Sequence, residues 1–291
     1  MRTKSSRFIA IAAALALIAL SGARSRAQES LTLDAVLDRL HAYLRDYATQ
    51  LPATIASEHY IQRAGQGSNA TERVLDSDFG IVRLPGLPEW LGFRDVLRAN
   101  GKPVGDRASR LDQLFLNPTA DRAKQAWLIA QESARQNIGP ITRTINNPAL
   151  VLELLDGRNA WRMRFDKGRD DTVGDIKAWV VRFKELVRPT IVSGGGNADA
   201  PATGRAWVDP VTGTLLRAEV TVSTPASGGG AVSCTTDVAF ERDAKLGFWV
   251  PSHMDEEYLN FRNARVSTGI ATYTNYRRFI VDTNESLSPQ P

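Results

Sequence analysis

Short runs of alternating apolar and polar residues dominate the chain after its first fifty residues. Successive side chains of a β-strand point to opposite faces, so such runs, bounded by Gly, Pro, Asn or Ser, predict antiparallel strands with one dry and one wet face. In the run 214–223, for example, Leu216, Ala218, Val220 and Val222 fall on one face. The predicted strands are residues 54–63, 73–84, 91–99, 160–165, 177–187, 205–208, 214–223, 232–241, 248–258 and 266–281.

Helical spacing replaces this alternation in two places. Thr32 is a suitable N-cap for a first helix, which Pro52 ends. Helical texture returns at residues 106–138, where Asn117 and Pro118 are typical of a helix start. The apolar positions of the first helix are Leu33, Val36, Leu37, Leu40, Leu44 and Tyr47, and those of the second are Ala123, Trp127, Ala130 and Ala134.

The beginning of the chain has the features of a secretory signal peptide. Arg2, Lys4 and Arg7 precede an apolar run of 13 residues, and small residues follow it. The run is shorter than the roughly 20 residues that a membrane-spanning helix needs. Residues 1–27 are therefore predicted to be cleaved, after Ala23 or Ala27, and the mature protein is predicted to be periplasmic or secreted.

Removal of this segment changes the charge balance. The full chain has 36 Lys and Arg against 32 Asp and Glu, a net charge of +4. Cleavage after Ala27 leaves 31 against 32, and cleavage after Ala23 leaves 33 against 32. A nearly neutral exported chain gives no general basis for nucleic-acid binding, which needs a clustered basic face.

Cys234 is the single cysteine, so the fold needs a hydrophobic core rather than an internal disulfide. It shares a predicted strand face with Val232, Val238 and Phe240, which indicates a small buried hydrophobe. No cysteine follows the apolar run directly, which excludes a bacterial lipoprotein anchor. Residues 28–284 are predicted to form a single β-rich domain with the helical segment 106–138, and residues 285–291 a disordered tail.

Three stretches of the C-terminal half, residues 204–219, 248–254 and 271–277, together resemble the periplasmic lipoprotein-carrier and outer-membrane lipoprotein-sorting superfamily. The first contains Trp207, the turn Asp209 to Gly213 and Glu219. The resemblance implies an α+β fold, mainly antiparallel β, in which a strongly curved sheet forms an unclosed barrel with helices packed over its concave face. It also implies an apolar cavity for acyl chains, and no functional residue can be carried over. As a whole, the chain resembles exported bacterial proteins without an assigned activity.

Polar clusters offer two alternative sites. His253, Asp255 and Glu257 share one strand face and could serve acid-base or metal chemistry, but Met254 and Tyr258 belong to the core, which places the three polar groups in water. The acidic segment 166–177 lacks the Gly and Glu that a twelve-residue calcium loop requires, which favours a solvated hairpin loop. No metal or cofactor is predicted, and no phosphate-binding loop or nucleophile motif occurs.

Aromatic side chains on the strands are the remaining candidates. Each could fill an ordinary core, but helices over a curved sheet can also leave an apolar pocket with few polar contacts. Trp179, Val181 and Phe183 share one strand face and are the first choices for its lining. The full predicted lining is Trp127, Trp161, Phe165, Trp179, Val181, Phe183 and Trp207.

The leading hypothesis is an exported, non-enzymatic protein that binds lipid acyl chains or another apolar ligand in the cell envelope. One alternative is a hydrolase, for which His253 with Asp255 or Glu257 is the sequence hint. The other is an envelope protein that binds another protein and no small ligand. Transient contact with the membrane or with an envelope protein is compatible with each.

Overall fold

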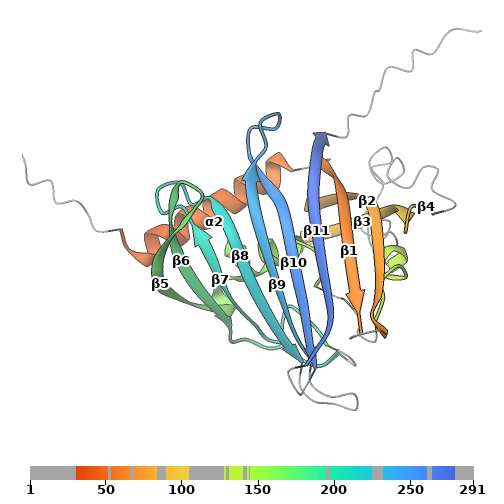
Figure 1. Ribbon diagram of the computed structural model, residues 1–291. Helices are drawn as coiled ribbons and strands as arrows, with labels where there is room; N and C mark the ends of the chain where they lie inside the picture. The colour runs from red at the N-terminus through yellow and green to blue at the C-terminus, as the bar shows by residue number, and fades with distance from the viewer. Residues whose placement is uncertain are drawn as a thin grey trace, which may run out of the picture.

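Eleven antiparallel strands form one continuous sheet in the computed structural model (Figure 1). The structure describes residues 31–51, 54–65, 69–83, 90–104, 128, 131–139, 143, 145–194, 197–224, 232–260 and 264–278. The strands are β1 (Thr54–Ala64), β2 (Thr71–Arg83), β3 (Trp90–Ala99), β4 (Lys102–Pro103), β5 (Met163–Val173), β6 (Ile176–Glu185), β7 (Ala202–Val208), β8 (Leu215–Thr224), β9 (Val232–Arg242), β10 (Trp249–Asn260) and β11 (Arg265–Arg278). The helices are α2 (Leu33–Gln50), α5 (Ala149–Leu155) and the 3-10 helix η2 (Gly157–Arg162).

The strand order is β4-β3-β2-β1-β11-β10-β9-β8-β7-β6-β5. The first strand, β1, pairs with the last, β11, so strands far apart in the sequence are neighbours in the sheet. β4 and β5 lie at opposite ends of the sheet and do not pair, so it is not closed into a barrel. The predicted fold class, an unclosed antiparallel sheet with covering helices, is confirmed.

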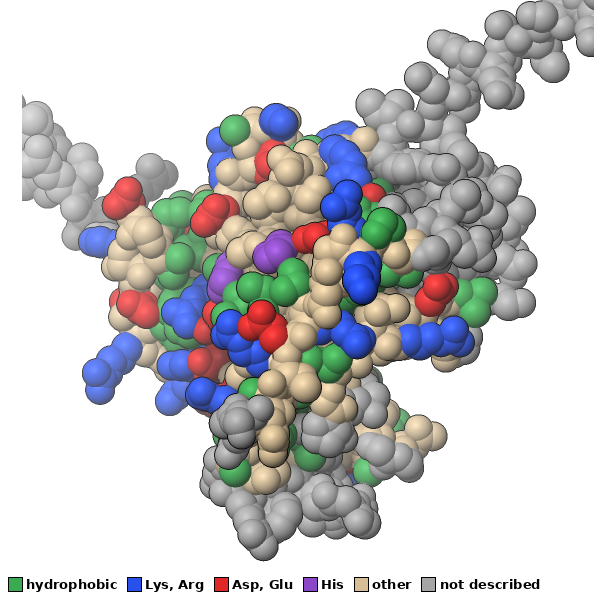
Figure 2. All heavy atoms as spheres, turned by 45° about the vertical axis from the view of Figure 1, so that its right-hand side comes forward, with side chains coloured by type: hydrophobic (Ala, Val, Ile, Leu, Met, Phe, Trp, Pro, Cys, Tyr) green, Lys and Arg blue, Asp and Glu red, His purple; other side chains and the backbone are tan. Residues whose placement is uncertain are grey.

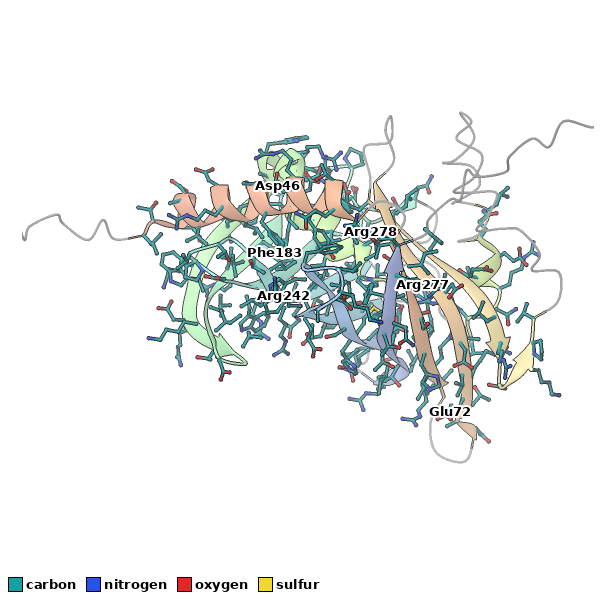
Figure 3. All side chains as sticks on the ribbon, turned by 90° about the horizontal axis from the view of Figure 1, so that it is seen from above. Asp46, Glu72, Phe183, Arg242, Arg277 and Arg278 are labelled. Carbon is teal, nitrogen blue, oxygen red and sulfur yellow. The ribbon has the colours of Figure 1, made fainter. Side chains whose placement is uncertain are left out.

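Helix α2 begins and packs as its sequence predicts. The Thr32 hydroxyl accepts a hydrogen bond from the Ala35 amide at 3.2 Å. The buried residues of the helix are Val36, Leu37, Leu40, Leu44 and Tyr47. Figure 3, which looks at the sheet from above, shows α2 lying across it with Phe183 between the helix and the strands.

The predicted turn from Asp209 to Gly213 lies directly under α2. The Gly213 amide donates to the Asp209 carbonyl at 2.8 Å, and Arg39 of the helix donates to the Pro210 carbonyl at 2.7 Å. Gly213 has a φ of +76°, and a Cβ there would overlap the Arg39 backbone. Glycine is therefore required at this contact for two separate reasons.

Several predictions about local structure are wrong or fall outside the described residues. Residues 160–162 belong to η2 rather than to a strand, and strand β5 runs on to Val173, so the acidic segment 166–177 is mostly strand with a tight turn at Gly174. Helix α5 lies in a stretch for which neither a helix nor a strand is predicted. Residues 128 and 131–134 are helical, as predicted, whereas residues 135–138 are not. The rest of 106–138 lies outside the described residues, as do residues 1–27 and 285–291.

Helix α5 escaped prediction because its seven residues carry no amphipathic pattern. Six of the seven are buried, Glu153 among them. The helix contacts β3 and β8, so its surroundings are protein on nearly every side. A short apolar run of this kind cannot be distinguished from a buried strand by its periodicity.

The sheet has a covered face, on which α2 and α5 pack, and an open face. One register shift at Trp207 and Val208 changes the predicted alternation, because Leu215 then joins the covered face while Leu216 packs with Trp207 on the other side. Over β5–β9 the buried side chains of the covered face are apolar except for Glu185 and Thr236, and we name this region the apolar half. Over β1–β3, β10 and β11 the covered face carries charged and hydroxyl side chains, and we name this region the polar half.

Candidate functional site

The seven residues predicted to line a pocket do not all meet in the structure. Phe165, Trp179, Val181 and Phe183 lie together on the covered face, within or against the main core. Trp207 belongs to a separate cluster with Ala178, Val180 and Leu216 on the open face. Trp161 lies on η2 and is 69% exposed, and Trp127 lies outside the described residues.

The four covered-face residues form an apolar site at one edge of the sheet, beside α2. Val181 and Phe183 are fully buried, whereas Phe165 and Trp179 are only partly buried because β5 is the last strand of the sheet. His41 of α2 lies edge-on to Phe165, with ring centroids 6.3 Å apart. We name this group the edge site: His41, Phe165, Trp179, Val181 and Phe183.

Two polar groups border the edge site. The ammonium of Lys167 lies 4.3 Å from the centroid of the Trp179 ring, a cation-π contact, and also pairs with Asp170. Burial lowers the pKa of His41 below its ordinary value of 6.5, although Asp38 and Asp156 oppose the shift. The His41 Nε2 atom is buried and has no hydrogen-bond partner within the described part of the chain.

The polar half contains buried ion pairs. The first of these pairs joins strands β1 and β3. Arg94 of β3 donates to both carboxylate oxygens of Glu58 on β1, and one of these distances is 2.6 Å. The Arg94 guanidinium also lies 4.4 Å from the centroid of the Tyr60 ring. Burial lowers the pKa of Arg94, but the charge and hydrogen bonds of Glu58 raise it further, so the pKa lies above its ordinary value. Arg94 therefore stays charged.

A second buried pair joins the sheet to the segment that precedes α5. Arg143 is not part of any strand, yet it donates to Glu256 on β10, and neither side chain is exposed to solvent. Arg143 also donates to the Ser267 hydroxyl, to the Thr268 carbonyl at 3.1 Å and to the Tyr60 hydroxyl at 3.1 Å. This one residue therefore holds its segment against β1, β10 and β11.

Hydroxyl groups complete this network. Tyr60 donates to one oxygen of Glu256, and Tyr258 donates to the other at 2.9 Å. Burial, and then the charge of Glu256, raises the pKa of both tyrosines above the ordinary value of 10. Each acidic group is thus paired and each tyrosine stays protonated, which suits a structural network more than proton transfer.

The acid-base candidates on β10 are placed as the alternation predicts. Met254 and Tyr258 are buried, while His253, Asp255 and Glu257 lie on the open face, where the side chain of Asp255 is 57% exposed. Glu256, which the sequence reasoning did not single out, is the buried carboxylate of this strand. The only available signal was its inward parity, since its partner Arg143 is 113 residues away.

The structure gives no support for a metal centre in the residues it describes. No three His, Cys, Asp or Glu side chains converge there in a manner that could hold an ion. In the acidic segment, Asp171 accepts a hydrogen bond from the indole of Trp207 at 2.8 Å, and Asp170 pairs with Lys167. Cys234 is buried as predicted, and burial raises the pKa of its thiol.

Comparison with known proteins identifies structural neighbours only. No protein family model and no curated protein matches the chain. An outer membrane lipoprotein-sorting protein domain from Vibrio parahaemolyticus is 12% identical with a TM-score of 0.37, covering 81% of this chain and 92% of its own. A DUF1329 family protein from Desulfovibrio piger is 12% identical with a TM-score of 0.40, covering 87% and 95%. A LolA superfamily protein from Nitrosomonas europaea is 9% identical with a TM-score of 0.30, covering 83% and 94%.

Two of these structures carry names from the superfamily that residues 204–219, 248–254 and 271–277 together resemble. With TM-scores of 0.30 to 0.40 these matches decide neither ligand nor activity. The ligand has to be inferred from the side chains of this chain.

Proposed function

We propose that this chain is an exported, non-enzymatic protein of the cell envelope that binds a lipid acyl chain or another apolar ligand. The observation that carries the proposal is the edge site. There the apolar layer between α2 and the sheet ends in two partly buried side chains, Phe165 on the terminal strand β5 and Trp179 on β6. An apolar chain entering between α2 and the β5–β6 hairpin would meet aromatic side chains without disturbing the buried ion pairs of Arg94 and Arg143.

The chemistry of the site fits such a ligand. Apolar pockets use a few polar groups to orient the ligand, and the buried Nε2 atom of His41 supplies one hydrogen-bonding group for a polar head. Lys167 stands at the outer side of Trp179 and supplies a positive charge that suits a carboxylate or phosphate head group. His41 and Lys167 both lie next to aromatic rings, so a ligand with an apolar chain and a polar head could contact both kinds of group.

The organisation of the rest of the molecule supports binding rather than catalysis. The buried carboxylates Glu58 and Glu256 are each held by an arginine, and the tyrosines beside them stay protonated. His253 lies on the open face, away from these groups. None of the described helices is long and apolar enough to cross a membrane. The proposed location, the periplasm or the exterior, rests on the N-terminal segment of the sequence.

Substitution of Trp179 tests the proposal directly. In Trp179→Glu a carboxylate replaces a partly buried wall residue, and an unpaired charge opposes an apolar ligand. We expect the affinity for a fluorescent fatty-acid probe to fall by about tenfold or more, which corresponds to about 1.4 kcal/mol. Thermal unfolding of the same variant shows how much of the loss arises from folding.

Ile270→Glu is the matched control, because Ile270 lies on the open face and is 36% exposed. It introduces the same charge in place of an apolar residue, and we expect unchanged probe binding. Phe183→Glu is expected to unfold the protein, since Phe183 is only 3% exposed. Absence of probe binding in the parent protein, or equal binding by Trp179→Glu and the parent, would reject the edge site and favour the protein-interaction alternative.

A further inference from the structure

The open face carries a basic hollow that the apolar edge site does not explain. It has a volume of about 440 Å³ and spans strands β5–β8. Four cationic side chains and two carboxylates line it, together with threonines. The charged lining residues are Arg164, Arg182, Lys184, Arg205, Asp166 and Glu219. In Figure 2, which shows one side of the molecule, Lys and Arg side chains are interspersed with fewer acidic ones.

The strand register sets like charges against each other in this hollow. Arg182 on β6 is the direct cross-strand partner of Arg205 on β7, and Arg164 on β5 is that of Lys184 on β6. Like charges directly opposite one another destabilise a sheet. Two such pairs side by side are therefore unfavourable unless a negative charge offsets them.

The two carboxylates of the hollow neutralise only two of its four cations. Glu219 forms a two-fold hydrogen bond with Arg205, at 2.7 and 3.1 Å, and Asp166 lies 3.4 Å from Arg164. Asp166 is also the register partner of Arg182, but its close contact is with Arg164. In the part of the chain that the structure describes, Arg182 donates only to the Lys167 carbonyl at 3.5 Å, and neither Arg182 nor Lys184 pairs with a carboxylate.

We propose that this hollow binds a phosphate-type oxyanion between Arg182, Lys184 and Arg205. The planar guanidinium groups provide paired donors that match phosphate oxygens, and the lysine adds a point charge. Thr203 and Thr221 also line the hollow and bring hydroxyl groups of the kind that donate to phosphate oxygens. The anion is a free phosphate or the phosphate of a lipid head group, and both have the same oxygens to offer.

Space beside the hollow allows the anion to carry a substituent. A second hollow of about 370 Å³ shares Arg182 and Arg205 with the first, and Trp207 lines it. Arg205 lies 5.1 Å and Arg217 4.6 Å from the centroid of the Trp207 ring, which holds the indole in place. A phosphomonoester or phosphodiester could therefore bind by its phosphate and rest its remaining part against Trp207.

Calorimetric titration of the mature protein with inorganic phosphate, at constant ionic strength set with chloride, tests the proposal. We expect saturable binding that becomes at least about tenfold weaker in Arg182→Gln and in Lys184→Gln. Lys177→Gln is the matched control, because Lys177 lies on the same strand, β6, but outside the hollow, and it removes the same charge. We also expect Arg182→Gln without phosphate to unfold at a temperature no lower than the parent, since it removes a like-charge contact.

Vesicles distinguish the two sources of the anion. If the protein floats with phosphatidylglycerol vesicles, and if Arg182→Gln or added phosphate abolishes this flotation, the anion is a lipid head group. If the protein binds phosphate but does not float with the vesicles, the anion is a free phosphate. Equal phosphate binding by Arg182→Gln, Lys177→Gln and the parent, or no binding of phosphate and of vesicles by the parent, would overturn the proposal. Fatty-acid probe binding is expected to be unaffected by Arg182→Gln, so failure here leaves the edge site standing.

Discussion

The apolar half and the polar half of the covered face are both buried, but largely by different kinds of side chain. In the apolar half, residues such as Val181, Val220 and Val238 fill the space beneath the helices. In the polar half, the equivalent inward positions hold Glu58 and Glu256, and arginines neutralise them. Alternation along a strand therefore predicts which side chains point inward but not whether they form a dry layer or an ion-pair network.

The two halves also differ in where their partners come from. Apolar contacts are non-directional, so any covering residue of suitable size can fill the apolar half. The polar half needs a specific donor at a specific place, and Arg143 reaches Glu256 from the segment before α5. The polar half thus fixes where that segment attaches, whereas the apolar half ends in the partly buried side chains Phe165 and Trp179.

Removal of Arg143 is expected to have the largest effect. Arg143→Met leaves Glu256 buried with no cationic partner, and loss of one member of a buried pair costs about 3–5 kcal/mol. Urea unfolding measures this change in the free energy of unfolding. Arg265→Met is the matched control, because Arg265 is 67% exposed in its pair with Glu257, and exposed pairs contribute about 1 kcal/mol or less.

The double variant Arg143→Met with Glu256→Gln isolates the charge. With no unpaired carboxylate left at position 256, we expect it to recover a large part of the lost stability, since only hydrogen bonds remain to be satisfied. Equal losses for Arg143→Met and Arg265→Met would show that the buried network is not what holds the segment before α5.

Enlargement of a glycine side chain in the apolar half is expected to have an intermediate effect on stability. A Cβ at Gly204 would overlap the Phe183 ring and the Glu219 carbonyl. Gly204→Ala therefore overpacks the sheet, which costs about 1–3 kcal/mol. Thermal and urea unfolding provide the value, and Gly174→Ala is unsuitable as a control because Gly174 has a φ of +57°. Recovery of stability in Gly204→Ala with Phe183→Leu would locate the overlap at the ring, and no recovery would place it at the backbone.

The smallest effect concerns pH and the edge site. Burial gives His41 a folded pKa below the unfolded value of 6.5, so the unfolded state binds the proton more tightly. The stability from neutral His41 is fully present above pH 6.5 and is lost as the pH falls toward the folded pKa. We expect the unfolding free energy of the parent to decline more steeply below pH 6.5 than that of His41→Gln. Identical slopes in the two proteins would contradict the burial of this imidazole.

The sequence predicts those features that depend on local periodicity. Met254 and Tyr258 are inward as expected, the α2 stripe from Val36 to Tyr47 is buried, and Cys234 lies in the core. It also predicts the single sheet, because successive strands with short turns leave few other arrangements. The grouping of Trp207 with Phe183 is wrong, because β7 aligns Trp207 with Val180 and so with the open face. The sequence of one strand does not reveal its register with the next.

The features that the sequence does not predict depend on contacts between residues far apart in the chain. The pairing of Arg143 with Glu256 joins residues 113 apart, and the pairing of Arg94 with Glu58 depends on the register of three strands. The cross-strand pairing of Arg182 with Arg205 likewise depends on the register between β6 and β7. No single stretch of sequence contains these contacts.

Extraction of the purified mature protein with organic solvent, followed by mass spectrometry, tests the central claim most directly. If the edge site binds an apolar chain, the extract of the parent protein should contain a lipid in stoichiometric amount, and the extract of Trp179→Glu should contain much less. Ile270→Glu, prepared in parallel, should retain the parent's amount. A folded parent protein that yields no lipid, and that takes none up when offered fatty acid or phospholipid, would contradict the account.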